Sequence, residues 1–155
     1  MRHKFIALLG LVTLAGTSPA WATATLFCEA SQKQIEFSII GIVPHGQGEP
    51  FLQVRGDLTA SPEGVTPPPP VIELNDGSNT QFWLDETTLN LAFYVEGEAT
   101  TPFRSALLTI KTQARADEPE YFDGKFHYES VQGAANEGGD PIAVTLDGKV
   151  TCSIG

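Results

Sequence analysis

The side chains best suited to chemistry lie on one short stretch in the C-terminal third of the chain. His127 and Glu129 are two residues apart, and in an extended strand such residues point to the same side, about 7 Å from each other. They could share a metal ion only with a third ligand from a neighbouring strand. Three further side chains have the same parity: Tyr121, Asp123 and Lys125. The pattern therefore favours a polar strand face that meets water.

His45 is the other histidine beyond the N-terminal segment. It lies in a loop bounded by proline and glycine, where an exposed side chain is expected. With only these two histidines available, we predict no metal site and no cofactor.

The densest group of charges is a set of four acids within seven residues: Asp117, Glu118, Glu120 and Asp123. Carboxylate oxygens can hold Ca²⁺, but the regular acid spacing and the distant glutamate of a calcium-binding loop are missing. We expect a solvated acidic turn. The alternatives are a weak divalent-cation site and a contact patch for a basic partner.

Phe82 and Trp83 are consecutive, so in a strand one of them must face away from the core. Trp83 is one of two tryptophans, and the other, Trp21, lies in the N-terminal segment. A tryptophan on a sheet face can stack on a sugar or anchor a protein contact. We favour a core position for Trp83 and retain it, with the four acids, as a candidate contact residue.

Motifs for covalent and nucleotide chemistry are missing from the sequence. No serine lies in a GxSxG turn, and the segment Gly46-Gln47-Gly48 lacks the third glycine of a dinucleotide fingerprint. Two carboxylates could hydrolyse a glycan, but among 19 acids no pair stands out. We therefore nominate no catalytic residue and keep a small carboxylate-based glycan hydrolase as an alternative.

The first 22 residues have the parts of a secretory signal. A basic start is followed by an apolar run from Phe5 to Ala15, and Ala20-Trp21-Ala22 supplies small residues for cleavage after Ala22. The apolar run is about half the ~20 residues that a membrane-spanning helix needs. We predict a cleaved signal over residues 1–22, a single domain over residues 23–155, and a periplasmic or secreted protein with no membrane insertion after cleavage.

Charge limits the partners. The full chain has a net charge of −10, and loss of the two positive charges of Arg2 and Lys4 makes it −12. So negative a protein repels phosphate backbones, which argues against nucleic-acid binding.

Cys28 and Cys152 are the only cysteines, one near each end of the expected domain. In an oxidising compartment they allow one intramolecular disulfide. Each has the parity of its apolar neighbours, so both sulfurs should face the core. Because the two cysteines belong to the first and last expected strands, the bridge would join those strands.

Alternation of apolar and polar residues, rather than helical periodicity, runs through the chain. The clearest stretches place on one side Ile35, Phe37 and Ile39; Leu52, Val54 and Leu58; Leu89, Leu91, Phe93 and Val95; Ala106, Leu108 and Ile110; and Phe122, Phe126 and Tyr128. Shorter runs raise the count to eight or nine strands. The predicted fold is all-β, an antiparallel β-sandwich or small closed barrel of about eight strands.

Three features should interrupt the strands. Asp147-Gly148 tolerates the backbone of a tight turn, so it predicts a hairpin between 142–146 and 150–154. Residues 113–118 could form one helical turn before Pro119. Pro67 to Pro70 favour a stiff extended crossing at the surface.

These observations favour an exported, non-catalytic β-domain that binds a partner through loops or one sheet face. The acidic surface points to a basic secreted protein or peptide, or a divalent cation, as that partner. The alternatives are the glycan hydrolase and a structural envelope protein. The sequence does not determine the oligomeric state.

Overall fold

The computed structural model describes residues 23–44, 51–64, 71–97, 104–133 and 139–155. The predicted signal (1–22), His45, the Gly46-Gln47-Gly48 segment and the four prolines lie outside these ranges. Within them no helix occurs, and hence none long and apolar enough to cross a membrane.

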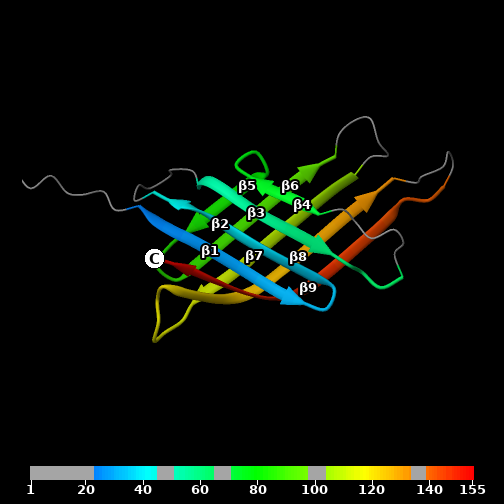
Figure 1. Ribbon diagram of the computed structural model, residues 1–155. Coiled ribbons are helices and arrows are strands. Elements are labelled where there is room, and N and C mark those ends of the chain that lie inside the picture. The colour runs from blue at the N-terminus through cyan, green and yellow to red at the C-terminus, as the bar shows by residue number, and fades with distance from the viewer. Residues whose placement is uncertain (1–22, 45–50, 65–70, 98–103, 134–138) are drawn as a thin grey trace, which may run out of the picture.

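The described residues form nine β-strands in one antiparallel sheet (Figure 1). Their bounds are β1 Ala24–Gln32, β2 Ile35–Val43, β3 Leu52–Ala60, β4 Ile72–Asn75, β5 Asn79–Leu84, β6 Thr88–Glu96, β7 Arg104–Ala114, β8 Tyr121–Gln132 and β9 Ile142–Ile154. The sheet curls into a half-barrel, which confirms the predicted all-β class.

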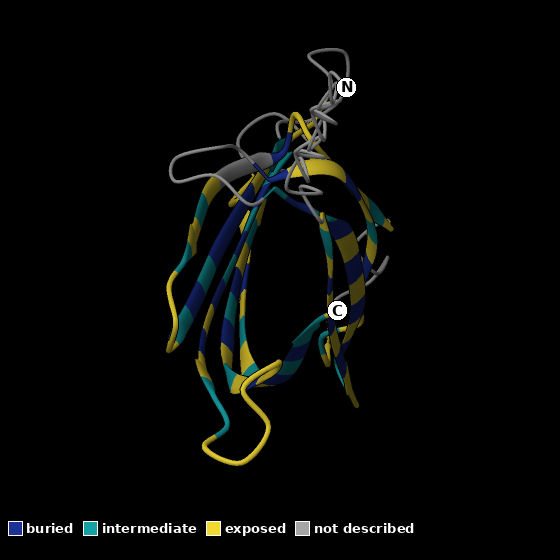
Figure 2. Cartoon of the chain, turned by 90° about the vertical axis from the view of Figure 1, so that its left-hand side faces the viewer, coloured by how far each residue is buried: buried dark blue, intermediate teal, exposed yellow. Residues whose placement is uncertain are grey.

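The strand order β4-β3-β2-β1-β9-β8-β7-β6-β5 is the order of the chain read around a circle. We call β1–β4 the first arm and β5–β9 the second arm. Because every neighbouring pair is antiparallel, β4 and β5 must run in the same direction. The turn between them therefore does not reverse the chain but carries it from one arm to the other, and the two arms cross and face each other (Figures 1 and 2).

Local hydrogen bonds hold the turn between β4 and β5 in place. The Ser78 hydroxyl donates to the Asn75 carbonyl oxygen (2.8 Å) and accepts from the Asn75 N–H (2.8 Å). The Tyr94 N–H of β6 donates to the Ser78 carbonyl oxygen at 2.7 Å. The two edge strands of the sheet are thus held near each other by the turn that joins them.

In the middle of the sheet the first strand, β1, pairs with the last, β9, and we call this pairing the seam. Cys28 lies directly opposite Cys152 in the seam, with their Cα atoms 4.0 Å apart, and the two sulfurs are bonded. Thr25 and Gly155 exchange backbone hydrogen bonds of 2.8 and 3.0 Å beside them. The disulfide thus links the first and last strands, as the sequence predicts.

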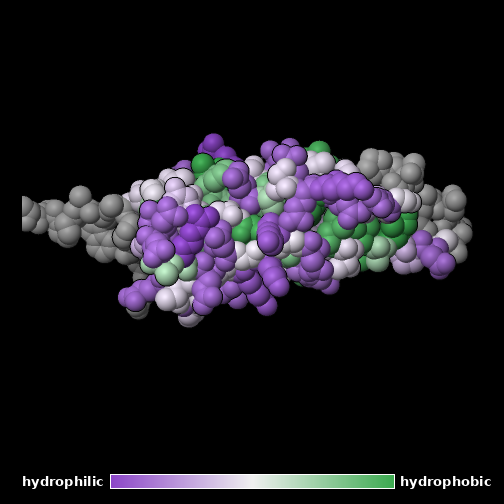
Figure 3. Space-filling model, turned by 90° about the horizontal axis from the view of Figure 1, so that it is seen from below, coloured by the Kyte–Doolittle hydropathy of each residue, from purple (hydrophilic) through white to green (hydrophobic). Residues whose placement is uncertain are grey.

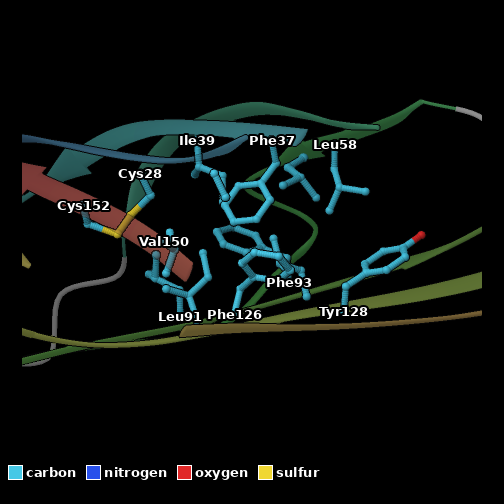
Figure 4. Packing of buried hydrophobic residues seen from close by; sticks show 14 of the residues in the cluster. Cys28, Phe37, Ile39, Leu58, Leu91, Phe93, Phe126, Tyr128, Val150 and Cys152 are labelled. Carbon is cyan, nitrogen blue, oxygen red and sulfur yellow. A yellow bond between two sulfur atoms is a disulfide. The ribbon is translucent and has the colours of Figure 1, made fainter. Parts of the chain in front are cut away.

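The core lies between the arms and is built from the alternating apolar positions, which appear as dark bands along each strand in Figure 2. Phe37 of the first arm meets Phe126 of the second edge to face, with ring centroids 5.2 Å apart (Figure 4). Phe51 stacks on Phe82 at the same centroid distance. Both sulfurs of the disulfide face this core, because Cys28 and Cys152 are at most 1% exposed.

The predicted hairpin at Asp147-Gly148 is wrong, because 142–154 is one strand that pairs with β8 throughout. A two-residue turn would have placed Leu146 opposite Lys149 and turned Val150 to the other face. Unbroken parity from Val144 to Cys152 instead keeps the apolar residues on one side. Gly148 lies close to the end of the Gln32 side chain, which would have to move aside to admit a Cβ.

Two smaller expectations are also wrong. Residues 113–118 form no helical turn, because 113 and 114 belong to β7 and the rest is a turn tied by Arg115. Leu52 does not face the core with Val54 and Leu58 but is 43% exposed. The register of β2 and β3 shifts between Ile40 and Ile42, Gln53 has a positive φ of 51°, and Phe51 fills the interior instead.

The seam is shorter than the strands that form it. Pairing of β1 with β9 ends at Glu29 and Thr151. Beyond this point one hydrogen bond between the two strands is found among the described residues, from the Gln32 amide to the Lys149 carbonyl oxygen (3.2 Å). Seen from below, hydrophobic surface lies between hydrophilic side chains (Figure 3). Among the described residues, nothing pairs with this edge of β9 from Ile142 to Gly148.

Loss of the disulfide should lower stability strongly. The double variant Cys28→Ala/Cys152→Ala is expected to lose up to about 5 kcal/mol of unfolding free energy, because the bridge closes a loop spanning 124 positions. Urea unfolding measures this loss, and reduced wild-type protein should match the variant. An unchanged midpoint would show that the seam does not depend on the bridge.

Amide exchange in β9 should alternate with residue number. The Thr25 and Gly155 bonds place odd-numbered N–H groups of β9 towards β1, so those of Ala143, Thr145 and Asp147 point to the open edge. Hydrogen exchange followed by NMR should show these three exchanging faster than Val144 and Leu146. Uniform protection would mean that another strand covers the edge.

Candidate functional site: the outer face of the sheet

The outer face of the first arm carries a row of unpaired acids. Cross-strand pairing puts Glu29 beside Ser38, Ser38 beside Asp57, and Asp57 beside Glu73, and all four side chains are exposed. We call Glu29, Asp57 and Glu73 the acidic row. None of its carboxylates has a hydrogen bond or ion pair with a side chain in the described part of the chain.

Few cations offset these charges within the first arm. The strands β1–β4 contain four acids, the acidic row and Glu36, against Arg55 alone. Asp57 and Glu73, which are directly paired, repel each other, and Arg55, two residues before Asp57 on the same face, forms no ion pair in the described part of the chain. The outer face of the first arm therefore carries negative charge that a positively charged binding partner could neutralise.

Exposed apolar side chains lie next to the acidic row. Phe27 and Ile40 are directly paired across β1 and β2, two residues along from Glu29 and Ser38, and they are 38% and 44% exposed. Leu52 on β3 is exposed as well. The first arm thus offers apolar contact area and negative charge side by side.

The four predicted acids lie at the turn between β7 and β8, where a cation ties down two of them. Arg115 donates from Nε to Asp123 (2.7 Å) and from Nη1 to Glu118 (2.9 Å), and its guanidinium lies over the Tyr121 ring, 5.0 Å from the centroid. Arg115 and the Thr151 hydroxyl hold the pKa of Asp123 below its usual range, and Asp123 and Glu118 raise the pKa of Arg115.

This arrangement limits what the acidic turn can do. Asp117 and Glu120 remain exposed, but Arg115 occupies the position between the other two acids that a cation would need. Within the described ranges, no group of three or more metal-ligating side chains is arranged to hold an ion. Arg115 lies three residues before Glu118, but that spacing predicts a contact only on a helix, so the sequence held no signal for this ion pair.

His127 is held between two carboxylates on the outer face of the second arm. Its Nδ1 lies 2.7 Å from Asp147 Oδ1 and its Nε2 lies 2.9 Å from Glu129 Oε1. Asp147 is the neighbouring-strand carboxylate that the sequence could not identify. Each ring nitrogen contacts a carboxylate, so the site favours the protonated imidazole. The contact with Glu129 has the largest effect and the contact with Asp147 the second largest, and both raise the pKa of His127.

Trp83 lies on the outer face and is 58% exposed, so the expected core position is wrong. Its neighbour Phe82 turns inward to stack on Phe51. Trp83 is on β5, whereas the acidic turn joins β7 to β8, and β6 lies between β5 and β7. The predicted contact residues therefore do not form one patch.

Comparisons with known protein families, with curated proteins and with solved structures give no match. The surface features that bear on function are therefore those of the two arms on the outer face.

The pKa of His127 should be above that of a histidine in the unfolded chain. The contacts of His127 with Glu129 and Asp147 stabilise the fold fully at pH values below the pKa of the unfolded chain, near 6.5. Their contribution is lost as the pH rises through the pKa of His127 in the folded protein. NMR titration of the imidazole should show the raised pKa, and Glu129→Gln should lower it. Equal pKa values in the variant and the wild type would contradict the contact.

Proposed function

We propose that the protein is an exported binding domain whose first arm receives a basic protein or peptide. The observation that carries this proposal is the acidic row, three exposed carboxylates lined up across β1–β4 that form no ion pair with any described residue. Lysine or arginine side chains of a partner would supply the missing counter-charge.

The apolar neighbours of the row support a protein partner rather than free ions. Charge speeds encounter and sets orientation, whereas buried apolar and aromatic side chains provide most of the affinity of an interface. Phe27 and Ile40 provide such contacts, and Phe27 lies two residues before Glu29 on the same face of β1. An amphipathic basic segment would match both features.

Export is part of the proposal. The 22-residue N-terminal pattern predicts it, and the Cys28–Cys152 disulfide is compatible with an oxidising compartment outside the cytoplasm. A domain working there holds its shape through the disulfide while its outer face stays available.

A divalent cation is a weaker partner for the same surface. Ca²⁺ prefers six to eight converging oxygens, whereas the acidic row is spread across four strands of a curved sheet. The acidic turn converges better but already contains Arg115.

Removing the row should weaken binding of a basic partner. The triple variant Glu29→Gln/Asp57→Asn/Glu73→Gln is expected to lose about tenfold in affinity, because three exposed ion pairs of about 0.5 kcal/mol each are lost. The probe is a lysine-rich amphipathic peptide, measured by calorimetry over a range of salt concentrations. Wild-type binding should weaken as salt rises, and the variant should show a smaller dependence.

Acids of the second arm provide the matched control. Glu86→Gln/Glu96→Gln/Asp140→Asn removes three exposed charges, at the β5–β6 turn, at the end of β6 and just before β9, and should leave affinity nearly unchanged. Phe27→Ser should weaken binding without changing the salt dependence. Equal losses in the triple variant and the control would show that only net charge matters, and this would refute a site on the first arm.

A further inference from the structure

The outer face of the second arm contains a groove of about 530 Å³ that differs in chemistry from the first arm. It crosses β5, β6 and β7. Its outward-facing lining consists of Gln81, Trp83, Asn90, Ala92, Thr109 and Lys111.

Strand register builds this groove. One cross-strand row runs from Trp83 through Asn90 to Lys111, and the next row passes through Ala92 and Thr109. Ala92 is small and only 8% exposed, so it forms a floor between longer side chains. Trp83 stands on one side of this floor and Lys111 on the other.

The indole of Trp83 is held in place although it is largely exposed. Its Nε1–H donates to Asp85 at 3.2 Å. Asp85 is itself fixed by the backbone N–H groups of Thr87 (2.8 Å) and Thr88 (2.7 Å). These bonds hold the pKa of Asp85 well below its usual range, so it stays ionised and keeps the ring oriented. An exposed ring that is fixed in orientation is preorganised for stacking.

Thr109 is the groove's polar side chain that the fold uses, since its hydroxyl donates to the His127 carbonyl oxygen (3.4 Å), whereas three others are left free in the described part of the chain. The carboxamides of Gln81 and Asn90 and the ammonium of Lys111 have no hydrogen-bond or ion-pair partner among the described residues. Two amides that can both donate and accept, next to a flat ring, match the alternating hydroxyl and C–H groups of a sugar.

A line of positive charge begins at the groove. Lys111 is directly opposite Lys125, and Lys125 is directly opposite Lys149, so three of the nine basic residues share one cross-strand row. The nearest acids on β8 and β9 are occupied: Asp123 by Arg115 and Asp147 by His127. Adjacent like charges cost stability unless an anion lies between them.

We propose that this groove binds an acidic saccharide. A pyranose ring would stack on Trp83, its hydroxyls would exchange hydrogen bonds with Gln81 and Asn90, and a carboxylate on the sugar would meet Lys111 and Lys125. This site is separate from the basic-partner surface, because it lies on the other arm and attracts charge of the opposite sign.

The test uses residues 23–155 with the disulfide intact. Trp83 is then the only tryptophan, so its fluorescence reports on the groove directly. The probe is a short oligogalacturonate, and a neutral galactose oligomer of the same length is the matched ligand. The acidic oligomer should change the emission and bind at least about tenfold more tightly than the neutral one, with an affinity that falls as salt rises.

Variants separate the two contacts. Calorimetry should show that Trp83→Ala loses about tenfold or more for the acidic oligomer while Trp83→Phe keeps most of the affinity. Lys111→Gln should lose about fivefold for the acidic oligomer alone. Lys33→Gln, on the first arm and paired with Glu63, is the control and should bind like the wild type.

Two results would contradict the saccharide site. No response to oligogalacturonate, or equal affinity for the acidic and neutral oligomers, would overturn the proposal. If Trp83→Ala proves unfolded by its amide spectrum, shifts of the Gln81 and Asn90 side-chain amides in titrated wild-type protein decide instead, and unshifted signals would also refute the site. Neither result bears on binding of a basic peptide to the first arm.

Discussion

The pairing of β1 with β9 is the constraint on which the rest of the structure depends. Strands that are consecutive in the chain are neighbours in the sheet, except for β4 and β5, and the pairing of β1 with β9 joins the two halves into one sheet. Here the closure lies in the middle of the sheet, where backbone bonds at Thr25 and Gly155 and the Cys28–Cys152 disulfide hold the termini together. The sheet edges lie instead at β4 and β5, which one short turn keeps near each other.

This closure also organises the surface. With the seam in place, the acidic row of the first arm continues across β9 through Thr151 to Asp123, and the lysine row of the second arm ends on β9 at Lys149. A row of acids and a row of lysines thus lie on one curved sheet, the first centred on the first arm and the second confined to the second arm. A protein with a net charge of −10 can in this way keep a local site for an anion.

Much of this architecture could be predicted from the sequence. Alternation of apolar residues identifies the strands because each has one buried face, and the parity of Cys28 and Cys152 shows that both point inward. Asp147-Gly148 misled the prediction because local turn preference gave way to pairing along the whole of β8. The clue was the uninterrupted parity on both sides of Gly148.

The surface rows could not be predicted, because they depend on register. Lys111, Lys125 and Lys149 are 14 and 24 residues apart and become neighbours only when three strands align residue by residue. The same holds for Glu29, Asp57 and Glu73. Alternation indicates which side of a strand a residue faces, but it does not show which residue lies opposite.

The most direct test of this account is a nuclear Overhauser spectrum of the oxidised domain across the seam. Cys28 with Cys152 and Leu26 with Ile154 are the close, non-hydrogen-bonded pairs of β1 and β9, so each should give a strong cross-peak between α-protons. A folded protein that lacks these peaks, or in which β1 shows such contacts with a strand other than β2 or β9, would contradict the closure and the surface rows derived from it.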